Sequence, residues 1–468
     1  IVSGKADLNQ AEQTLRFASG VVVTQQGNVL KAERFKVNFG EDRVIYRATA
    51  QEDVDLTMSG GALPNANLGP AKGTRRLLCR KLDLWFRPDR TLQTMTAGPD
   101  ADLTVLPGPL DPPERRRVRA KFIEFRFDEK GQLAAMQTAK DTVMESFPLK
   151  GKQTKRATQS VTCERMLAEI VPGTQEPRLV EFQEKVVFLQ GKQKAVTELA
   201  AYTSGAATLE LFTEPELWDG EQGTHLKARN IVIGTRTNDV TAKEDVQSVL
   251  ERKNGRAGLL AGKEEPAIIT ARFLDYVSAT RTGLYREGAL LRSGKDEIRA
   301  HEIRLQETPQ GRRLEGRGEV LARLNPKAEG EAAPASKVET RSQGMVYDET
   351  SGRIEYRGDV FIRQGEITTR SPAATLVLTA DGAGIASLRA GEPVEVQMGS
   401  RKATGAFGTY TPGDQTMVLV GDKVTLKDPS QEIQGRSLVF HLDDDRVTVD
   451  GREAVRTETI FRKEPPKL

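Results

Sequence analysis

Cysteine and histidine are scarce in this sequence, which has two cysteines, Cys79 and Cys163, and three histidines among 468 residues. The five residues are scattered, and no pair shows a C-x-x-C or H-x-x-x-H spacing, so we predict no metal site. The sequence also lacks the G-x-S-x-G elbow, the P-loop and the G-x-G-x-x-G dinucleotide motif, and we expect no cofactor. Each cysteine precedes an apolar stripe, and two interpretations stay open: two small core residues or a disulfide.

Aromatic residues and an excess of one charge are also missing. Aromatics make up 5% of the chain against 37% for all hydrophobic residues, which argues against one large aromatic-rich core. The 69 Lys and Arg nearly balance the 66 Asp and Glu, leaving a net charge of +3. This balance excludes a nucleic-acid partner recognised through bulk positive charge.

Long apolar runs are absent. No stretch approaches the roughly 18 apolar residues that a membrane-spanning helix needs. The chain opens on IVSGKADL, which has neither the basic nor the apolar region of a signal peptide. We interpret it as a cytosolic protein or as a mature form whose targeting segment has been removed.

What the sequence does have is alternation of apolar and polar residues with period 2, the signature of β-strands. Turn signals rich in Asp, Gly, Pro and Ser end most of these runs, and a further run follows each turn. The clearest runs are 29–39, 80–86, 121–127, 228–234, 302–306 and 437–442. Little of the chain follows a helical period, and we predict an all-β fold.

A short signature recurs along the chain: an acidic residue, often after Gly, precedes a Val that we expect to face the interior. It stands before Val54, Val143, Val186, Val246, Val320, Val360, Val394 and Val424. We expect the Gly to allow a bulge or bend between successive strands. The marks divide the chain into about thirteen half-repeats of about 36 residues, which is typical of stacked supersecondary units.

Inserts rich in Gly, Pro and Ala interrupt the repeats and suggest boundaries. We predict N-terminal repeats over 1–150, central degenerate repeats over 151–325 and C-terminal repeats over 338–468. The inserts at 60–74 and 107–114 are expected to be loops, and 326–337 a linker or loop.

The C-terminal repeats carry a family resemblance. The segments AFGTYTPGDQTMVLVGDKVTL (406–426) and IQGRSLVFHL (433–442) closely resemble the OstA/LptA family, with a Tyr, a turn, apolar alternation and a G-D-x-V element in that order. Residues 342–398 and 1–58 match the pattern too, 268–323 more loosely, and 75–260 only as degenerate half-units.

The resemblance implies a fold and a function. It implies an elongated β-jellyroll, with two facing antiparallel sheets in an open-ended V. It also implies a periplasmic location and a bridge that carries lipopolysaccharide from the inner to the outer membrane, its acyl chains shielded in a hydrophobic groove. The implied partners are a lipopolysaccharide-type lipid, an inner-membrane LptC-like protein and an outer-membrane LptD-like protein, joined by pairing of edge strands.

Two sets of residues are candidates for such a site. For each member of the first set, plain core packing is the alternative to lipid contact. The groove candidates are Phe35, Val37, Phe39, Leu82, Leu84, Phe86, Ile231, Ile233, Val360, Ile362, Val424, Leu426, Leu438 and Phe440. The possible anion-facing residues are Arg115, Arg116, Arg117 and Arg119, for which a solvated face is the alternative.

Two other functions compete with lipid transport. One is a structural β-solenoid or β-sandwich of the carbohydrate-binding or adhesin type, although the units are too uneven for strict short rungs. The other is a polysaccharide-cleaving enzyme with paired carboxylates, such as 443–445. Because acidic residues recur in every repeat, we interpret them as structural and expect no enzyme activity.

Overall fold

A computed structural model describes residues 1–25, 27–58, 62–63, 66–67, 73–108, 114–148, 158–172, 176–221, 223–251, 266–325, 337–380, 384–429, 431–442, 446–450 and 458–461. Within these residues the secondary structure is β-strand apart from one short 3-10 turn, which confirms the all-β prediction. No helix among them is long and apolar enough to cross a membrane. Most of the 60–74 insert, the centre of the 107–114 insert, the 326–336 part of the linker and Asp443–Asp445 lie outside the described residues.

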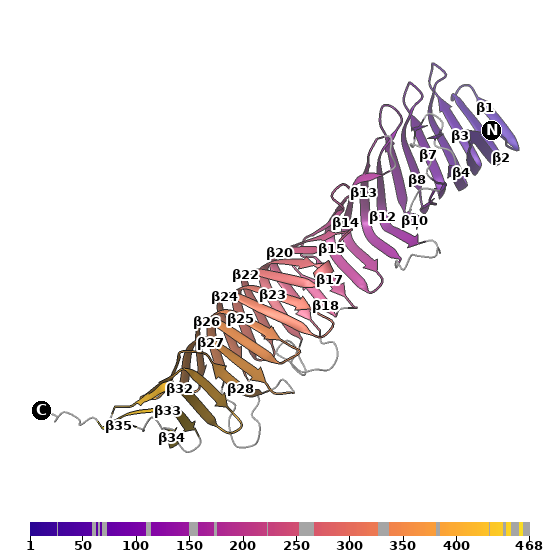
Figure 1. Ribbon diagram of the computed structural model, residues 1–468. Helices are drawn as coiled ribbons and strands as arrows, with labels where there is room; N and C mark the ends of the chain where they lie inside the picture. Colours follow the sequence, from indigo (N-terminus) through magenta and orange to yellow (C-terminus); the bar gives the residue numbers. More distant parts are fainter. Residues whose placement is uncertain are drawn as a thin grey trace. The chain divides into compact units, whose positions relative to one another are not determined.

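The chain forms two compact units: Ile1–Glu221 with Arg229–Arg236, and Gln222–Ala228 with Thr237–Leu468. We call them unit 1 and unit 2, and Figure 1 draws the strands of each side by side. The predicted division at 150, 325 and 338 stays a prediction.

The strands of unit 1 pair antiparallel, mostly with their neighbours in the chain. They are β1 (Lys5–Asn9), β2 (Thr14–Gln25), β3 (Asn28–Phe39), β4 (Ile45–Met58), β5 (Ala62–Leu63), β6 (Ala66–Asn67), β7 (Arg75–Phe86), β8 (Leu92–Gly98), β9 (Ala101–Val105), β10 (Glu114–Ala120), β11 (Phe122–Phe127), β12 (Leu133–Pro148), β13 (Gln159–Ile170), β14 (Pro177–Gln190), β15 (Gln193–Thr203), β16 (Thr208–Phe212), β17 (Glu216–Asp219) and β19 (Asn230–Gly234).

Unit 2 follows the same plan, again with antiparallel neighbours. Its elements are β18 (Thr224–Lys227), β20 (Val240–Leu250), β21 (Ala267–Val277), the 3-10 turn η1 (Ser278–Thr280), β22 (Thr282–Ser293), β23 (Asp296–Glu307), β24 (Arg312–Leu324), β25 (Val338–Asp348), β26 (Arg353–Gln364), β27 (Ile367–Leu378), β28 (Ile385–Ala390), β29 (Val394–Met398), β30 (Arg401–Gly405), β31 (Phe407–Thr411), β32 (Thr416–Lys427), β33 (Gln431–His441), β34 (Arg446–Asp450) and β35 (Glu458–Phe461).

Each long strand bends once near its middle, where the register of its pairing shifts; we call this point the corner. In alternate strands two consecutive residues there have positive φ, as in Glu52–Asp53 of β4 and Gly358–Asp359 of β26. The further corner pairs are Ser19–Gly20, Lys140–Asp141, Glu184–Lys185, Glu244–Asp245, Glu287–Gly288 and Gly318–Glu319. The acidic signature is therefore a bulge, as expected, but it lies inside a strand rather than between successive strands.

The residues after the corner face inward as predicted. Val54, Val186, Val246, Val320 and Val360 are all buried. In β12 the sequence pattern had pointed to Val143, but the corner pair Lys140–Asp141 ends one residue earlier and Thr142 takes the buried position.

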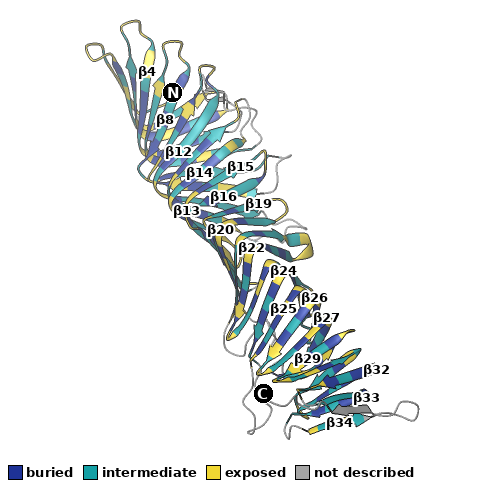
Figure 2. Ribbon diagram, turned by 90° about the vertical axis from the view of Figure 1, so that its left-hand side faces the viewer, coloured by how far each residue is buried: buried dark blue, intermediate teal, exposed yellow. Residues whose placement is uncertain are grey.

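The corner also sets which residues are buried on each side of it. In strands with a corner pair, the buried positions step by four across the bend, as from Tyr356 to Val360. In the neighbouring strands they step by three, as from Ser342 to Met345. The alternation of buried and less buried residues is visible along the strands in Figure 2. Both halves of a strand therefore present apolar side chains to the same interior.

Three places among the described residues replace a bent strand by two short ones, and one of them follows β15, whose two halves pair with β16 and β17. After β7 the chain makes β8 and β9, then β10 and β11, before the long strand β12. After β27 it makes β28 and β29, then β30 and β31, before β32. The breaks in β8–β9 and β28–β29 fall at Gly98–Pro99 and Glu392–Pro393, where a proline cannot donate to the ladder.

Candidate functional site

The interior between the two halves of the bent strands is the candidate site. In unit 1 one line of directly paired residues runs across it, from Phe35 in β3 to Ile231 in β19. We call it the Leu82 row, and its members are all buried. They are Phe35, Ala50, Leu82, Ala97, Ile123, Thr138, Met166, Phe182, Ala200, Leu211 and Ile231. Large and small side chains alternate over much of the row, so neighbouring strands can interlock.

Unit 2 has two such lines, one from each half of its strands. The Ile362 row consists of Ser248, Ile269, Leu291, Ile298, Ala322, Thr340, Ile362, Thr369, Val396, Ala403, Leu426 and Ile433. The Tyr356 row consists of Ala242, Leu274, Tyr285, Ile303, Gly316, Met345, Tyr356, Ala374, Ala390, Gly408, Leu419 and Leu438. At about 4.8 Å per strand, each row spans about 50 Å.

The two rows of unit 2 meet in one core. Leu426 of the Ile362 row and Leu438 of the Tyr356 row belong to a single hydrophobic cluster with Val424 and Phe440. Leu438 pairs with Leu419 on one side of the corner, whereas Leu426 pairs with Ile433 on the other. The strand halves therefore face each other across this cluster, as two facing sheets require.

The structure places the fourteen groove candidates in or beside these interiors. Ten are buried: Phe35, Val37, Leu82, Ile231, Val360, Ile362, Val424, Leu426, Leu438 and Phe440. Four are half-buried: Phe39, Leu84, Phe86 and Ile233. The half-buried four occupy the last three positions of their strands, where fewer neighbouring residues cover them. Contact of any of the fourteen with lipid stays a prediction.

The four arginines predicted to face anions lie on β10, and each has an acidic or aromatic partner. The partners are Phe147 for Arg115, Glu114 for Arg116, Asp102 for Arg117 and Glu145 for Arg119. These contacts offset part of the positive charge of the strand. The anion-facing role stays a prediction.

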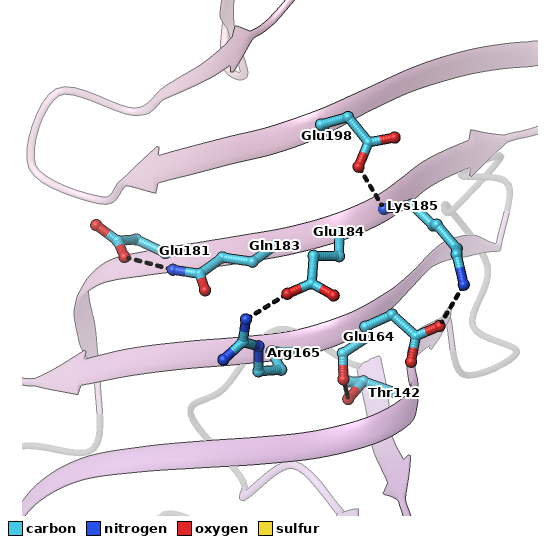
Figure 3. A network of polar contacts seen from close by, with 8 residues as sticks. All are labelled: Thr142, Glu164, Arg165, Glu181, Gln183, Glu184, Lys185 and Glu198. Carbon is cyan, nitrogen blue, oxygen red and sulfur yellow. Dashed lines mark hydrogen bonds and ion pairs between the residues drawn. The ribbon is translucent and has the colours of Figure 1, made fainter.

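The outer side of the corner is polar and its charges are paired (Figure 3). Lys185 Nζ donates a hydrogen bond to Glu164 at 2.9 Å, and this bond lowers the pKa of the Glu164 carboxyl. Arg165 forms an ion pair with Glu184, and the backbone N–H of Lys185 donates to Glu198 at 3.2 Å. The acidic residues of the repeat signature thus hold neighbouring strands together at the bend.

Groups suited to catalysis or metal binding do not gather among the residues that the structure describes. No cluster of three His, Cys, Asp or Glu side chains there could hold a metal ion. His225, His301 and His441 lie on three different strands, β18, β23 and β33. Cys79 and Cys163 are free and buried. Of the two interpretations left open by the sequence, this agrees with two small core residues and not with a disulfide. Burial raises the pKa of both thiols to about 11.

The sequence reasoning missed the polar members of the interior rows. Thr340 and Tyr356 are fully buried and face the same interior as Ile362. A search for buried positions at i, i+2, i+5 and i+7 would have included Thr340 in β25, and one at i, i+2, i+6 and i+8 would have included Tyr356 in β26. A strict period of 2 loses the phase at the step of three in β25, whereas the step of four in β26 keeps it.

Comparison with known proteins finds a family model that matches part of the C-terminal region. Residues 339–446 match a family model described as LptA/(LptD N-terminal domain) LPS transport protein. The bent, facing antiparallel strands of that segment define the class as a β-jellyroll protein. The match supports the resemblance to the OstA/LptA family that the sequence predicts, and it covers these residues of the chain.

A solved structure is also similar to this chain. It is LptH from Pseudomonas aeruginosa, described as the LptA homologous periplasmic component of the conserved lipopolysaccharide transport device. It is 17% identical, the alignment covers 27% of this chain and 95% of that chain, and the TM-score is 0.25. No curated protein sequence matches the chain.

Proposed function

We propose that this protein is a non-catalytic component of a periplasmic bridge that transports lipopolysaccharide between the inner and outer membranes. The observation that carries the proposal is the set of continuous, mainly apolar rows inside each unit, together with the family match over 339–446. An acyl chain needs extended apolar surface and few hydrogen-bond partners, and aliphatic residues repeated on every strand supply that surface.

In this proposal the acyl chains enter the interior by separating the two facing halves of the strands. The exchange is feasible because apolar contact with the lipid replaces apolar contact between the sheets, while the backbone ladders remain intact. The sugars and phosphates of the lipid stay outside, where the strands carry polar and charged side chains such as Lys427.

The proposed partners are inner-membrane LptC-like and outer-membrane LptD-like proteins. Strand β1 supports pairing with a partner, because among the described strands it pairs with β2 alone and four of its five residues are exposed. An exposed strand with one free edge can accept a strand from another chain.

Photo-crosslinking tests the lipid contact. A photoreactive phenylalanine analogue at Leu426, which is buried, should give lipopolysaccharide adducts. The same analogue at the adjacent Lys427, whose side chain is 54% exposed, is the matched control and should give few. Adducts from Lys427 alone would contradict an interior path, and adducts from Phe440 would extend it to the next strand.

A further inference from the structure

A charged side chain is buried in unit 2, although the interior rows are mainly apolar. Arg312, the first residue of β24, is 9% exposed. Its Nε lies 3.3 Å from a carboxylate oxygen of Glu307, its pairing partner on β23. Its Nη2 donates a hydrogen bond of 3.3 Å to the backbone carbonyl oxygen of Glu251. A buried guanidinium needs such partners, because burial removes its hydration.

The hydrogen bond from Arg312 to Glu251 joins the two sides of the interior. Arg312 precedes the corner of β24, on the strand half that contributes Gly316 to the Tyr356 row. Glu251 follows the last residue of β20, whose half beyond the corner contributes Ser248 to the Ile362 row. Both residues lie at the strand ends farthest from the corners. The bond therefore closes the interior of unit 2 on the side away from the corners.

A second hydrogen bond crosses the same part of the interior, closer to the corners. Tyr285 of the Tyr356 row and Ser248 of the Ile362 row share it through their hydroxyl groups. Their residues are 4% and 5% exposed. The charges of Glu307 and Arg312 also act on the Tyr285 phenol, so the two hydrogen bonds are neighbours. We call the Arg312–Glu251 and Tyr285–Ser248 bonds together the polar bridge.

The polar bridge differs from the way in which the two sides meet at β32 and β33. There Leu426 and Leu438 belong to one hydrophobic cluster. An acyl chain that enters such a cluster replaces one apolar contact by another. At the polar bridge the same chain has to break two hydrogen bonds and leave the Glu251 carbonyl and the Tyr285 phenol without partners, which costs more.

We propose that the polar bridge is a gate in the lipid path of unit 2. It holds the interior closed between β20 and β24, and an acyl chain passes only while both hydrogen bonds are open. This inference rests on the proposed function and assigns Arg312 and Tyr285 as the residues that limit passage. Because the open state is the less populated one, closure lowers the apparent affinity for lipid at this point.

Photo-crosslinking at two positions measures the gate locally. A photoreactive phenylalanine analogue at Leu291 reports lipid beside the polar bridge, and the same analogue at Leu426 reports lipid in the apolar cluster; both positions are buried. With subsaturating purified lipopolysaccharide, the wild-type chain should give fewer adducts from Leu291 than from Leu426. Combining Arg312→Met with Tyr285→Phe should raise the yield from Leu291 about tenfold, because removing the bonds makes the open state more populated. The yield from Leu426 should stay the same.

Two further variants separate gating from a general change in the fold. Ser248→Ala removes the partner of Tyr285 and should raise the yield from Leu291 by a smaller factor. Arg313→Met is the matched control, because the Arg313 side chain is 49% exposed and pairs with Glu315 on its own strand. It should leave both yields unchanged. Circular dichroism without lipid checks that each variant is folded, since unfolding would lower the yield at both positions.

The outcomes separate this inference from the proposed function. If the double variant leaves the yield from Leu291 unchanged while Leu426 still gives adducts, the gate is wrong and the lipid path stands. A lower yield from Leu291 would also overturn the gate, because Arg312 and Tyr285 would then hold the lipid instead of excluding it. If neither position gives adducts in any variant, both proposals fail.

Discussion

At the scale of single residues, the interior is lined mainly by apolar side chains, and the charged side chains lie on the outer surface. The buried side chains are mainly Ala, Val, Leu, Ile and Met, and the paired charges lie outside, as at Lys185 and Glu164. The two thiols belong to the interior as well: Cys79 and Cys163 are buried on β7 and β13. Desolvation is the main cause of their raised pKa.

Thiol reactivity tests this environment. With a pKa of about 11, each native thiol has a thiolate fraction at pH 8 about a hundredfold below that of an ordinary cysteine. A disulfide reagent such as DTNB should therefore label the native protein slowly and the urea-unfolded protein rapidly. An exposed cysteine introduced by Lys427→Cys is the positive control, and fast labelling of native Cys79 would contradict the buried position.

The same pKa shift predicts how stability depends on pH. Because the folded pKa lies above the unfolded one, the folded state holds its thiol protons more tightly. This contribution to stability is complete below about pH 9 and is lost as the pH rises towards about 11. The variant with both Cys79→Ala and Cys163→Ala should lose less stability over that window, measured by urea unfolding.

At the scale of the strand, the corner is the feature that makes a two-sided interior. Two successive positive-φ residues bend the strand and keep its buried side chains in phase, whereas the neighbouring strand changes phase with a step of three. Left-handed backbone is costly for residues with a Cβ and free for glycine. This cost favours the Gly found in four of the eight corner pairs, whereas in the other four both left-handed residues carry a Cβ.

A comparison of alanine substitutions at two corner glycines, Gly288 and Gly358, tests the cost of left-handed backbone at the corner. Gly288 has φ +78°, and a Cβ there would meet nothing within 4 Å, so Gly288→Ala should cost about 1–2 kcal/mol for the left-handed backbone alone. Gly358 has φ +76°, but a Cβ there would lie 2.9 Å from Gln343 Cβ. Gly358→Ala should therefore cost more than Gly288→Ala. Urea unfolding followed by circular dichroism measures both, and equal or negligible costs would show that the corner tolerates ordinary backbone.

At the scale of the whole molecule, each unit has its own interior, and each interior is lined by residues from many strands. The Leu82 row crosses unit 1 and the Ile362 and Tyr356 rows cross unit 2. No single strand forms the apolar lining of an interior, because each strand contributes only one residue to a row. A lipid bound in either interior would stabilise the folded protein relative to the unfolded chain.

Thermal unfolding with lipid tests this expectation. Lipopolysaccharide at about 100 times its dissociation constant should stabilise the protein by about 2.7 kcal/mol and raise the unfolding temperature. The deacylated saccharide at the same concentration should have no effect, because the interior offers it no apolar contact. An equal shift with the saccharide would instead favour the carbohydrate-binding alternative.

Much of the fold could be predicted because strands and turns are local. Alternation at 29–39 and 437–442 marked β3 and β33, and the acidic signature before Val54 and Val360 marked corners that the structure confirms. The prediction failed where the phase depends on the neighbour: it expected the bend between strands, and it placed Val143 instead of Thr142 inside. A period of 2 counted along one strand does not reveal how far apart the buried residues on either side of the corner are. That spacing of three or four residues depends on the pairing with the neighbouring strand.

The sequence by itself determined the all-β class, the repeated corner and the resemblance of the C-terminal segment to the OstA/LptA family, because each depends on residues close together in the chain. The tertiary structure alone decided which residues share an interior row. Phe35 and Ile231 lie nearly two hundred residues apart, yet a chain of strand pairings joins them in one row. It also brought Thr340 and Tyr356 to opposite faces of the same interior, because only the bend of the strands turns their two halves toward each other.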